Sequence, residues 1–175
     1  MALIFLRHAP IRDAAGLCYG QFDVAAEPVG AAELASLAAS LGKPARILTS
    51  PLSRCQDLAL PLGRHLGQSP IVDVRLAEMD FGRWEGRPWT EIPRSEIDEW
   101  AADVEGARPH RGESVAMLGA RVSDFIRDVQ GRAGDSLVVT HLGVVRAALR
   151  AVGRVDALET RLGFCEALRL EETLE

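Results

Sequence analysis

The stretch Leu3-Ile4-Phe5-Leu6-Arg7-His8 sets the interpretation of this chain, because four large apolar residues run directly into an arginine–histidine pair. A short, continuous apolar run of this kind predicts a fully buried strand. In open α/β sheets, ligands bind beyond the carboxyl ends of the strands. Arg7 and His8 are therefore expected at the mouth of a site, where a guanidinium can bind phosphate and an imidazole can act as a nucleophile.

The composition indicates a single domain over residues 1–175, because a chain of this length buries roughly 70% of its unfolded surface. The net charge of −5 argues against a general nucleic-acid binder, although a few arginines in a pocket can still hold a small anion. The chain lacks an apolar run near the ~20 residues of a membrane helix and a recognisable signal peptide, so we expect no membrane partner. Cys18, Cys55 and Cys165 fit neither a disulfide framework nor a CxxC metal pattern, which favours a cytoplasmic setting.

Apolar periodicity predicts strands that alternate with helices. Strands are expected at residues 2–7, 46–49, 71–74, 136–140 and 164–170, and helices at residues 33–41, 51–66, 96–104, 115–129 and from about 143. Ser50 is expected to cap the second helix, with Pro51 at its first position. Residues 80–112, which hold all three tryptophans, are expected to form a loop-rich excursion that partly covers the site. The alternation predicts an α/β, three-layer sandwich, with a mostly parallel central sheet and helices on both faces.

His8 is the expected nucleophile, because a neutral imidazole has a free lone pair that can attack phosphorus and form a phosphohistidine. A backbone carbonyl is expected to hold its other ring nitrogen. Arg7, Arg54 and His141 are expected around the phosphoryl group, whose transfer depends on preorganised donors. Arg54 falls in the first turn of a predicted helix, and His141 ends a buried strand at the start of another helix.

Glu78 is the expected general acid, because an alkoxide leaving group needs a proton near neutral pH. Its neighbours Met79 and Phe81 are apolar and can shelter the carboxyl group. Glu85 and Glu113 are the alternative acids, although Glu85 is more typical of a residue that shapes its loop.

Five segments resemble the motifs of the histidine phosphatase (phosphoglycerate-mutase-like) superfamily, in that family's order. They are Leu6–Ala9, Thr49–Arg54, Leu76–Gly86, Gly112–Ser114 and Val138–Arg146. The resemblance implies that His8 is phosphorylated and that Glu78 donates the proton. It also implies a phosphate pocket that contains Arg7, Arg54, His141 and the backbone of Leu142. Ala9, Pro10 and Leu142 depart from the usual residues of the family, which bears on phosphate affinity more than on the type of reaction.

The loop Gly16–Val24 is the main clue to the substrate, because it resembles the corresponding loop of α-ribazole phosphatases. That resemblance implies α-ribazole 5′-phosphate, an intermediate of cobalamin biosynthesis, as the substrate. Tyr19 then offers a flat face and a hydroxyl group, and Gln21 lies in the same loop. Glu113 and Ser114 match a segment that lines the substrate side in the family.

The sequence therefore predicts a metal-independent phosphomonoesterase that acts on a small phosphorylated metabolite and needs no cofactor. It contains no HExxH-type metal spacing and no GxxxxGK phosphate loop. A broad-specificity phosphatase and a phosphoglycerate mutase are the alternatives, although the chain is short for a mutase. A non-catalytic binder of phosphorylated ligands is the alternative from another class. A second copy of the chain, as a homodimer, is the only protein partner considered.

Overall fold

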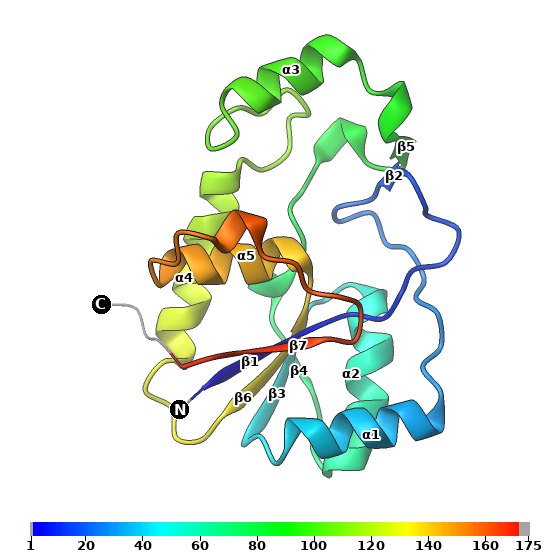
Figure 1. The fold of residues 1–175 in the computed structure, drawn as a ribbon, viewed down its shortest axis with the longest axis vertical. Helices are drawn as coiled ribbons and strands as arrows, with labels where there is room; N and C mark the ends of the chain where they lie inside the picture. Colours follow the sequence, from blue (N-terminus) through cyan, green and yellow to red (C-terminus); the bar gives the residue numbers. More distant parts are fainter. Residues whose placement is uncertain (1, 172–175) are drawn as a thin grey trace.

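The computed structural model describes residues 2–171 and contains a five-stranded sheet of order β4–β3–β6–β1–β7 (Figure 1). The strands are β1 (Leu3–Arg7), β3 (Arg46–Thr49), β4 (Ile71–Val72), β6 (Ser136–Thr140) and β7 (Ala167–Leu170). All neighbouring pairs are parallel except β1 and β7, which are antiparallel. The mostly parallel α/β sheet predicted from the sequence is confirmed.

Two pairs of helices cover the two faces of this sheet (Figure 1). Helices α1 (Ala31–Leu41) and α2 (Ser53–Leu66) lie on one face, and α4 (Val115–Val129) and α5 (Leu142–Ala151) lie on the other. Strand β1 feeds both layers because successive side chains of a strand point to opposite faces. Its Leu3 and Phe5 join the core beneath α4 and α5, whereas Ile4 and Leu6 join the core beneath α1 and α2. The predicted three-layer sandwich is therefore confirmed.

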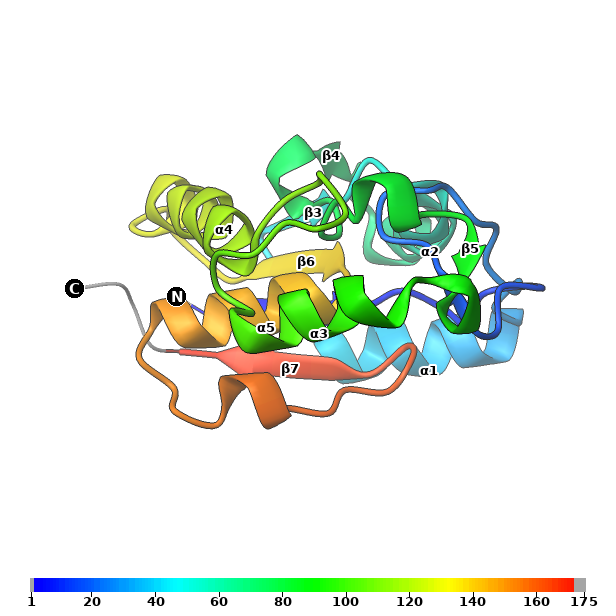
Figure 2. The same ribbon diagram turned by 90° about the horizontal axis from the view of Figure 1, so that it is seen from above.

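The excursion of residues 80–112 forms the top of the molecule in Figure 1, and Figure 2 looks down on it. It contains α3 (Arg94–Ala102), the short strand β5 (Arg87–Pro88) and two 3-10 turns, η2 (Gly82–Trp84) and η3 (Trp89–Glu91). Strand β5 pairs with β2 (Leu17–Cys18), so the loop after β1 is tied to the excursion. Trp84 is fully buried in a small core of the excursion and packs on Trp89 and Trp100.

Several predicted boundaries are wrong, each for a local reason. The strand expected at residues 71–74 ends at Val72, because the Asp73 carboxylate accepts a hydrogen bond from the Arg75 amide and starts the turn η1 (Val74–Leu76). The helix expected from Pro51 begins at Ser53 with Leu52 as its N-cap, so Ser50 does not cap it. The last strand begins at Ala167, after Cys165 adopts a positive φ of 55°.

The remaining elements differ little from expectation. Helix α3 lies two residues before its expected position, and α5 begins at Leu142 rather than Gly143. A fourth 3-10 turn, η4 (Ala157–Glu159), follows α5. Within residues 2–171, no helix is both long and apolar enough to cross a membrane. The three cysteines are free thiols, as the sequence predicts.

Candidate active site

Three parallel strands deliver polar residues to one edge of the sheet. His8 follows β1, Ser50 follows β3 and His141 follows β6. The register is held by backbone hydrogen bonds from His8 N to Thr140 O at 3.0 Å and from Ser50 N to Val139 O at 3.0 Å. The rings of His8 and His141 lie 5.1 Å apart between centroids. The structure thus brings together two histidines that are 133 residues apart in sequence, as the strand-end argument predicts.

The His8 side chain is held in one tautomer. Its Nδ1 lies 2.7 Å from the Ala9 carbonyl oxygen, which can only accept a hydrogen bond, so Nδ1 carries the proton and Nε2 keeps its lone pair. Burial is the main cause that lowers the pKa of His8 to about 3, and the charges of Arg54 and Arg7 add to it against the opposing Ala9 bond. The ring is therefore neutral at pH 7, the state that a nucleophilic imidazole needs.

His141 lies in a buried network with the first turn of α2. Arg54 Nε donates to His141 Nδ1 at 3.3 Å, so the proton is on Nε2, which donates to Ser50 Oγ at 2.8 Å. Burial first, and then the charge of Arg54, lowers the pKa of His141 well below its usual value. The Sγ of Cys55 lies 3.4 Å from the same Nε2. Both ring nitrogens of His141 thus have protein partners. A hydrogen bond from Nε2 to phosphate requires that Nε2 first lose its hydrogen bond to Ser50.

Arg54 is fully buried and anchors the loop after β1. Its Nη2 donates to Gly20 O at 2.5 Å, and its Nη1 donates to Phe22 O at 3.2 Å. The Tyr19 ring covers the guanidinium, with 5.1 Å between Arg54 Cζ and the ring centroid. Three of the five N–H donors of Arg54 therefore have protein acceptors, and its charge lies within reach of His8 and His141.

Arg7 has a different environment, with one donor unused. Its Nη1 donates to Leu162 O at 2.7 Å, and the Phe164 ring lies 4.0 Å from its Cζ. Its Nε is buried and has no hydrogen-bond partner within residues 2–171. Buried donors are nearly always paired in native proteins, so an unpaired one beside a cavity is suited to an incoming anion.

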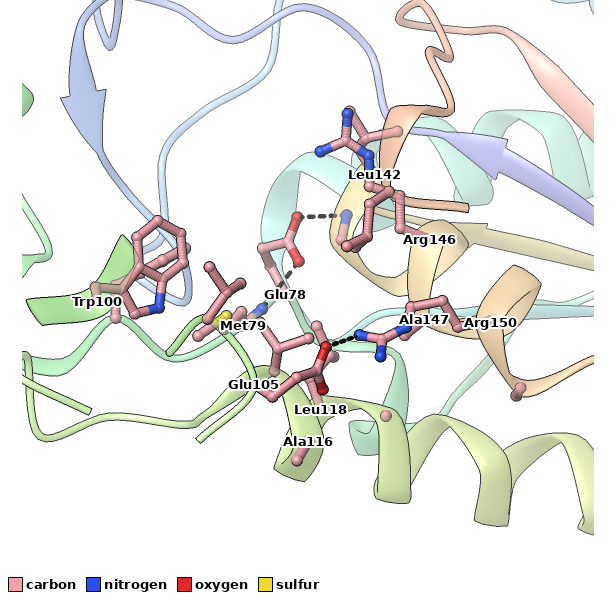
Figure 3. A pocket seen from close by; sticks show the side chains of 18 of the residues that line it. Glu78, Met79, Trp100, Glu105, Ala116, Leu118, Leu142, Arg146, Ala147 and Arg150 are labelled. Atoms are coloured by element: carbon pink, nitrogen blue, oxygen red, sulfur yellow. Dashed lines mark hydrogen bonds and ion pairs between the residues drawn. The ribbon is translucent and has the colours of Figure 1, made fainter. Parts of the chain in front are cut away.

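Glu78 and Arg7 both line one cavity and define its mouth. Its Oε2 accepts from Gly143 N at 3.2 Å, and its Oε1 accepts from Met79 N at 2.9 Å (Figure 3). A Cβ atom on Gly143 would collide with the Glu78 carboxylate, so glycine is required for this close approach. The neighbouring Leu142, the first residue of α5, also lines the cavity at the amino end of the helix.

A cavity of about 750 Å³ extends from this mouth. Its walls are the loop after β1, the segment from Glu78 to Glu105, and helices α4 and α5 (Figure 3). Most lining side chains are apolar, among them Leu17, Met79, Phe81, Trp100, Leu118 and Ala147. Its size is typical of a small-molecule site. His8, Arg54 and His141 are at most 2% exposed and are not among its lining residues.

Of the four predicted specificity residues, only Tyr19 lines this cavity. Gln21 instead donates from Nε2 to the Glu78 backbone oxygen at 3.0 Å, and Ser114 caps α4. Burial raises the pKa of Glu113, but hydrogen bonds from Arg121 and the Asp80 amide outweigh it and lower the pKa. Glu113 is thus paired with Arg121 and is not among the residues that line the cavity.

Glu85 has the loop-shaping role that its position indicates. Its Oε1 accepts from the amides of Gln21 and Phe81, both at 2.8 Å. These bonds tie the loop after β1 to the excursion.

Sequence reasoning missed Arg121 and Phe164. Arg121 on α4 donates to the backbone oxygens of Ala77 and Glu78 at 2.7 and 3.0 Å, and it pairs with Glu113, so it holds the backbone that carries the proposed acid. The sequence feature that could have identified Arg121 is its position between Leu118 and Val122, on the apolar stripe of a helix. For Phe164, which touches Arg7 and lies 5.5 Å from His8, the sequence holds no such signal.

Within residues 2–171, no three His, Cys, Asp or Glu side chains are grouped so that they could hold a metal ion.

Comparisons with known proteins agree with this geometry. A family model described as histidine phosphatase superfamily (branch 1) matches residues 3–166. A glucosyl-3-phosphoglycerate phosphatase of Mycolicibacterium vanbaalenii is 30% identical over 166 residues, which cover 86% of this chain and 73% of that protein. The protein of that name from Mycobacterium tuberculosis is 32% identical, and the match covers 73% of this chain and 59% of that protein. A metal-independent phosphoserine phosphatase of Arabidopsis thaliana is 28% identical, and the match covers 83% of this chain and 66% of that protein.

Solved structures show the same fold. A mycobacterial glucosyl-3-phosphoglycerate phosphatase in complex with VO3 has a TM-score of 0.81 and 25% identity over 96% of this chain and 91% of that one. A protein from Thermus thermophilus has a TM-score of 0.74 and 26% identity over 100% and 98% of the two chains.

Proposed function

The chain belongs to the histidine phosphatase superfamily, and we propose that it hydrolyses small phosphomonoesters through a phosphohistidine on His8. Membership of the superfamily and its phosphatase-named relatives make it a phosphoric monoester hydrolase. One observation carries the proposal. His8 is neutral, its Nδ1–H is held by Ala9, and it lies at the end of β1 beside an arginine with an unpaired Nε.

The proposed reaction has two steps. His8 Nε2 attacks phosphorus, the bond between phosphorus and the ester oxygen breaks, and Glu78 transfers a proton to the departing oxygen. Water then attacks the phosphohistidine and gives a proton to the Glu78 carboxylate, the bond between phosphorus and Nε2 breaks, and inorganic phosphate leaves with His8 and Glu78 back in their starting states. Arg7, Arg54 and the N-terminus of α5 supply positive charge for the three equatorial oxygens.

The finer substrate assignment is open to three candidates. The relatives named above suggest glucosyl-3-phosphoglycerate and phosphoserine. The loop Gly16–Val24 suggests α-ribazole 5′-phosphate, which the comparisons do not support. Tyr19 lines the cavity together with Arg7 and Glu78, and this position is compatible with all three substrates. A phosphoglycerate mutase and a non-catalytic binder remain the alternatives.

The test is phosphate release in EDTA from a panel of these three esters, 3-phosphoglycerate and p-nitrophenyl phosphate. We expect release from at least one ester, and we expect His8→Ala to lower kcat by at least about 10³-fold. His65→Ala, which changes a histidine outside the site, is the matched control. Activity that survives in His8→Ala would contradict the mechanism, and no release by the wild type would favour the binder.

A further inference from the structure

Several polar side chains of the cavity are bonded to the protein, and the buried Trp100 Nε1 is a lining donor without a hydrogen-bond partner within residues 2–171. The Ser123 hydroxyl donates to Gly119 O at 2.8 Å, and Arg146 donates through Nε and Nη2 to Thr160 O at 3.1 and 3.0 Å. Arg150 pairs with Glu105 across the cavity wall (Figure 3). Arg146 is thus held by a carbonyl oxygen rather than by a carboxylate, and Arg7 and Glu78 are the lining residues that the proposed reaction uses.

The remaining surface is aromatic and aliphatic. Trp100 of the excursion lies across the cavity from Leu118 of α4 and Ala147 of α5 (Figure 3), and Phe81 also lines the cavity. A polyhydroxylated group placed there loses its hydration and regains few hydrogen bonds, which disfavours its binding. A group of similar size made of CH₂ units is instead favoured, because its apolar surface is removed from water.

From this arrangement we propose that the cavity holds the leaving-group alcohol, and that this alcohol is a bulky, mainly apolar group rather than a sugar. The proposal rests on the phosphatase function above, because the phosphate must lie at His8 for the alcohol to reach the cavity. It specifies the substrate class as phosphomonoesters of ring-sized or branched alkyl alcohols. On this ground glucosyl-3-phosphoglycerate is a poor fit to this chain.

Two matched esters separate the two classes. Cyclohexylmethyl phosphate and glucose 6-phosphate both carry a six-membered ring on a CH₂–O–phosphate group, so their leaving groups are similar and only the polarity of the ring differs greatly. We expect kcat/KM to be at least about tenfold higher for cyclohexylmethyl phosphate, the range found for small changes in apolar pockets. An equal or higher value for glucose 6-phosphate overturns the inference.

Gly119 allows the cavity to be filled without damage to the fold. It lines the cavity, and a Cβ placed on it meets no atom within 4 Å. Gly119→Leu also improves the helix propensity of α4. We expect it to lower kcat/KM for cyclohexylmethyl phosphate at least about tenfold and to lower that for ethyl phosphate less. Ala120→Leu, which places the same leucine side chain at an exposed neighbour outside the cavity, is the control.

Failure of this inference differs from failure of the proposed function. If ethyl and p-nitrophenyl phosphate are also not hydrolysed, the phosphatase function fails. Calorimetric binding of both ring esters to His8→Ala then decides the cavity question separately. Tighter binding of cyclohexylmethyl phosphate, weakened by Gly119→Leu, supports the inference, and tighter or equal binding of glucose 6-phosphate overturns it.

Discussion

The strand-end network and the cavity beside it follow opposite physical rules. In the network, His141 and Arg54 are fully buried and each is held by several hydrogen bonds. In the cavity, the walls are mainly apolar and come partly from the excursion, which packs around its own small core. Chemistry common to all phosphomonoesters needs the fixed geometry of the first region. Selection among alcohols needs only the shape and polarity of the second, and it can change without disturbing the first.

Glu78 stands where the two regions meet. Its carboxylate touches the start of α5 through Gly143, its backbone is held by Arg121, and its side chain lines the cavity. If the two regions have these separate roles, loss of the proton donor at Glu78 should lower kcat. The decrease should be largest for substrates whose leaving group must be protonated as it departs.

Glu78→Gln therefore has the largest expected effect among the variants that test this boundary. For an alkyl phosphate we expect kcat to fall about 10²- to 10⁴-fold, the usual contribution of general acid catalysis. For p-nitrophenyl phosphate, whose leaving group departs as a stable anion, the fall should be much smaller. Steady-state kinetics on both esters measure the difference, with Glu91→Gln at an exposed position as the control. Equal losses on both esters would remove Glu78 from the acid role.

The difference between the two regions also explains which features of the protein can be predicted from the sequence alone. The strands, the three layers and the meeting of His8 with His141 are predictable, because buried runs such as Leu3–Leu6 and Leu137–Thr140 have strong patterns and parallel strands end at one edge. These features depend on local composition and on general rules of chain topology. They require no knowledge of side-chain packing.

The partners of the site residues could not be predicted. Ser50 carries the signature of a helix cap, but its hydroxyl accepts from His141, which is 91 residues away. The sequence assigns Gln21 and Glu113 to the substrate, whereas both support the backbone around Glu78 and Asp80. Such contacts depend on tertiary packing of loops, for which a single sequence has no periodic signal.

Gly143→Ala sharpens the comparison with a smaller expected effect. The new Cβ collides with the Glu78 carboxylate, so the acid must move from the cavity mouth while His8 and its network stay in place. We expect kcat for an alkyl phosphate to fall about 10- to 100-fold, the cost of a small misplacement, with little change for p-nitrophenyl phosphate. Gly30→Ala, where a Cβ meets open space, is the control. An alkyl-phosphate rate at the wild-type level would show that the carboxylate position does not matter.

The pH dependence of stability tests the buried network itself and has the smallest expected effect. Unfolded histidines titrate near 6.5, whereas burial lowers the pKa of His8 to about 3 and also lowers the pKa values of His141 and His110. Below pH 6.5 the unfolded state therefore binds protons that the folded state does not bind. The free energy of unfolding should be greatest above pH 6.5 and should decrease as pH falls toward 4.5.

The contribution of one histidine can be isolated by difference. Each histidine whose pKa is lowered in the folded state reduces the free energy of unfolding by up to about 1.4 kcal/mol for each unit that the pH falls below 6.5. Burial raises the pKa of Glu85, which gives the opposite slope at the lower end of this range. Comparison of the wild type with His8→Gln by urea denaturation between pH 4.5 and 7.5 cancels that contribution. We expect the variant to have a slope smaller by one proton, because only the buried, neutral His8 has been removed. Parallel curves would mean that His8 binds its proton equally well in the folded and unfolded states, which would contradict a pKa that burial lowers to about 3.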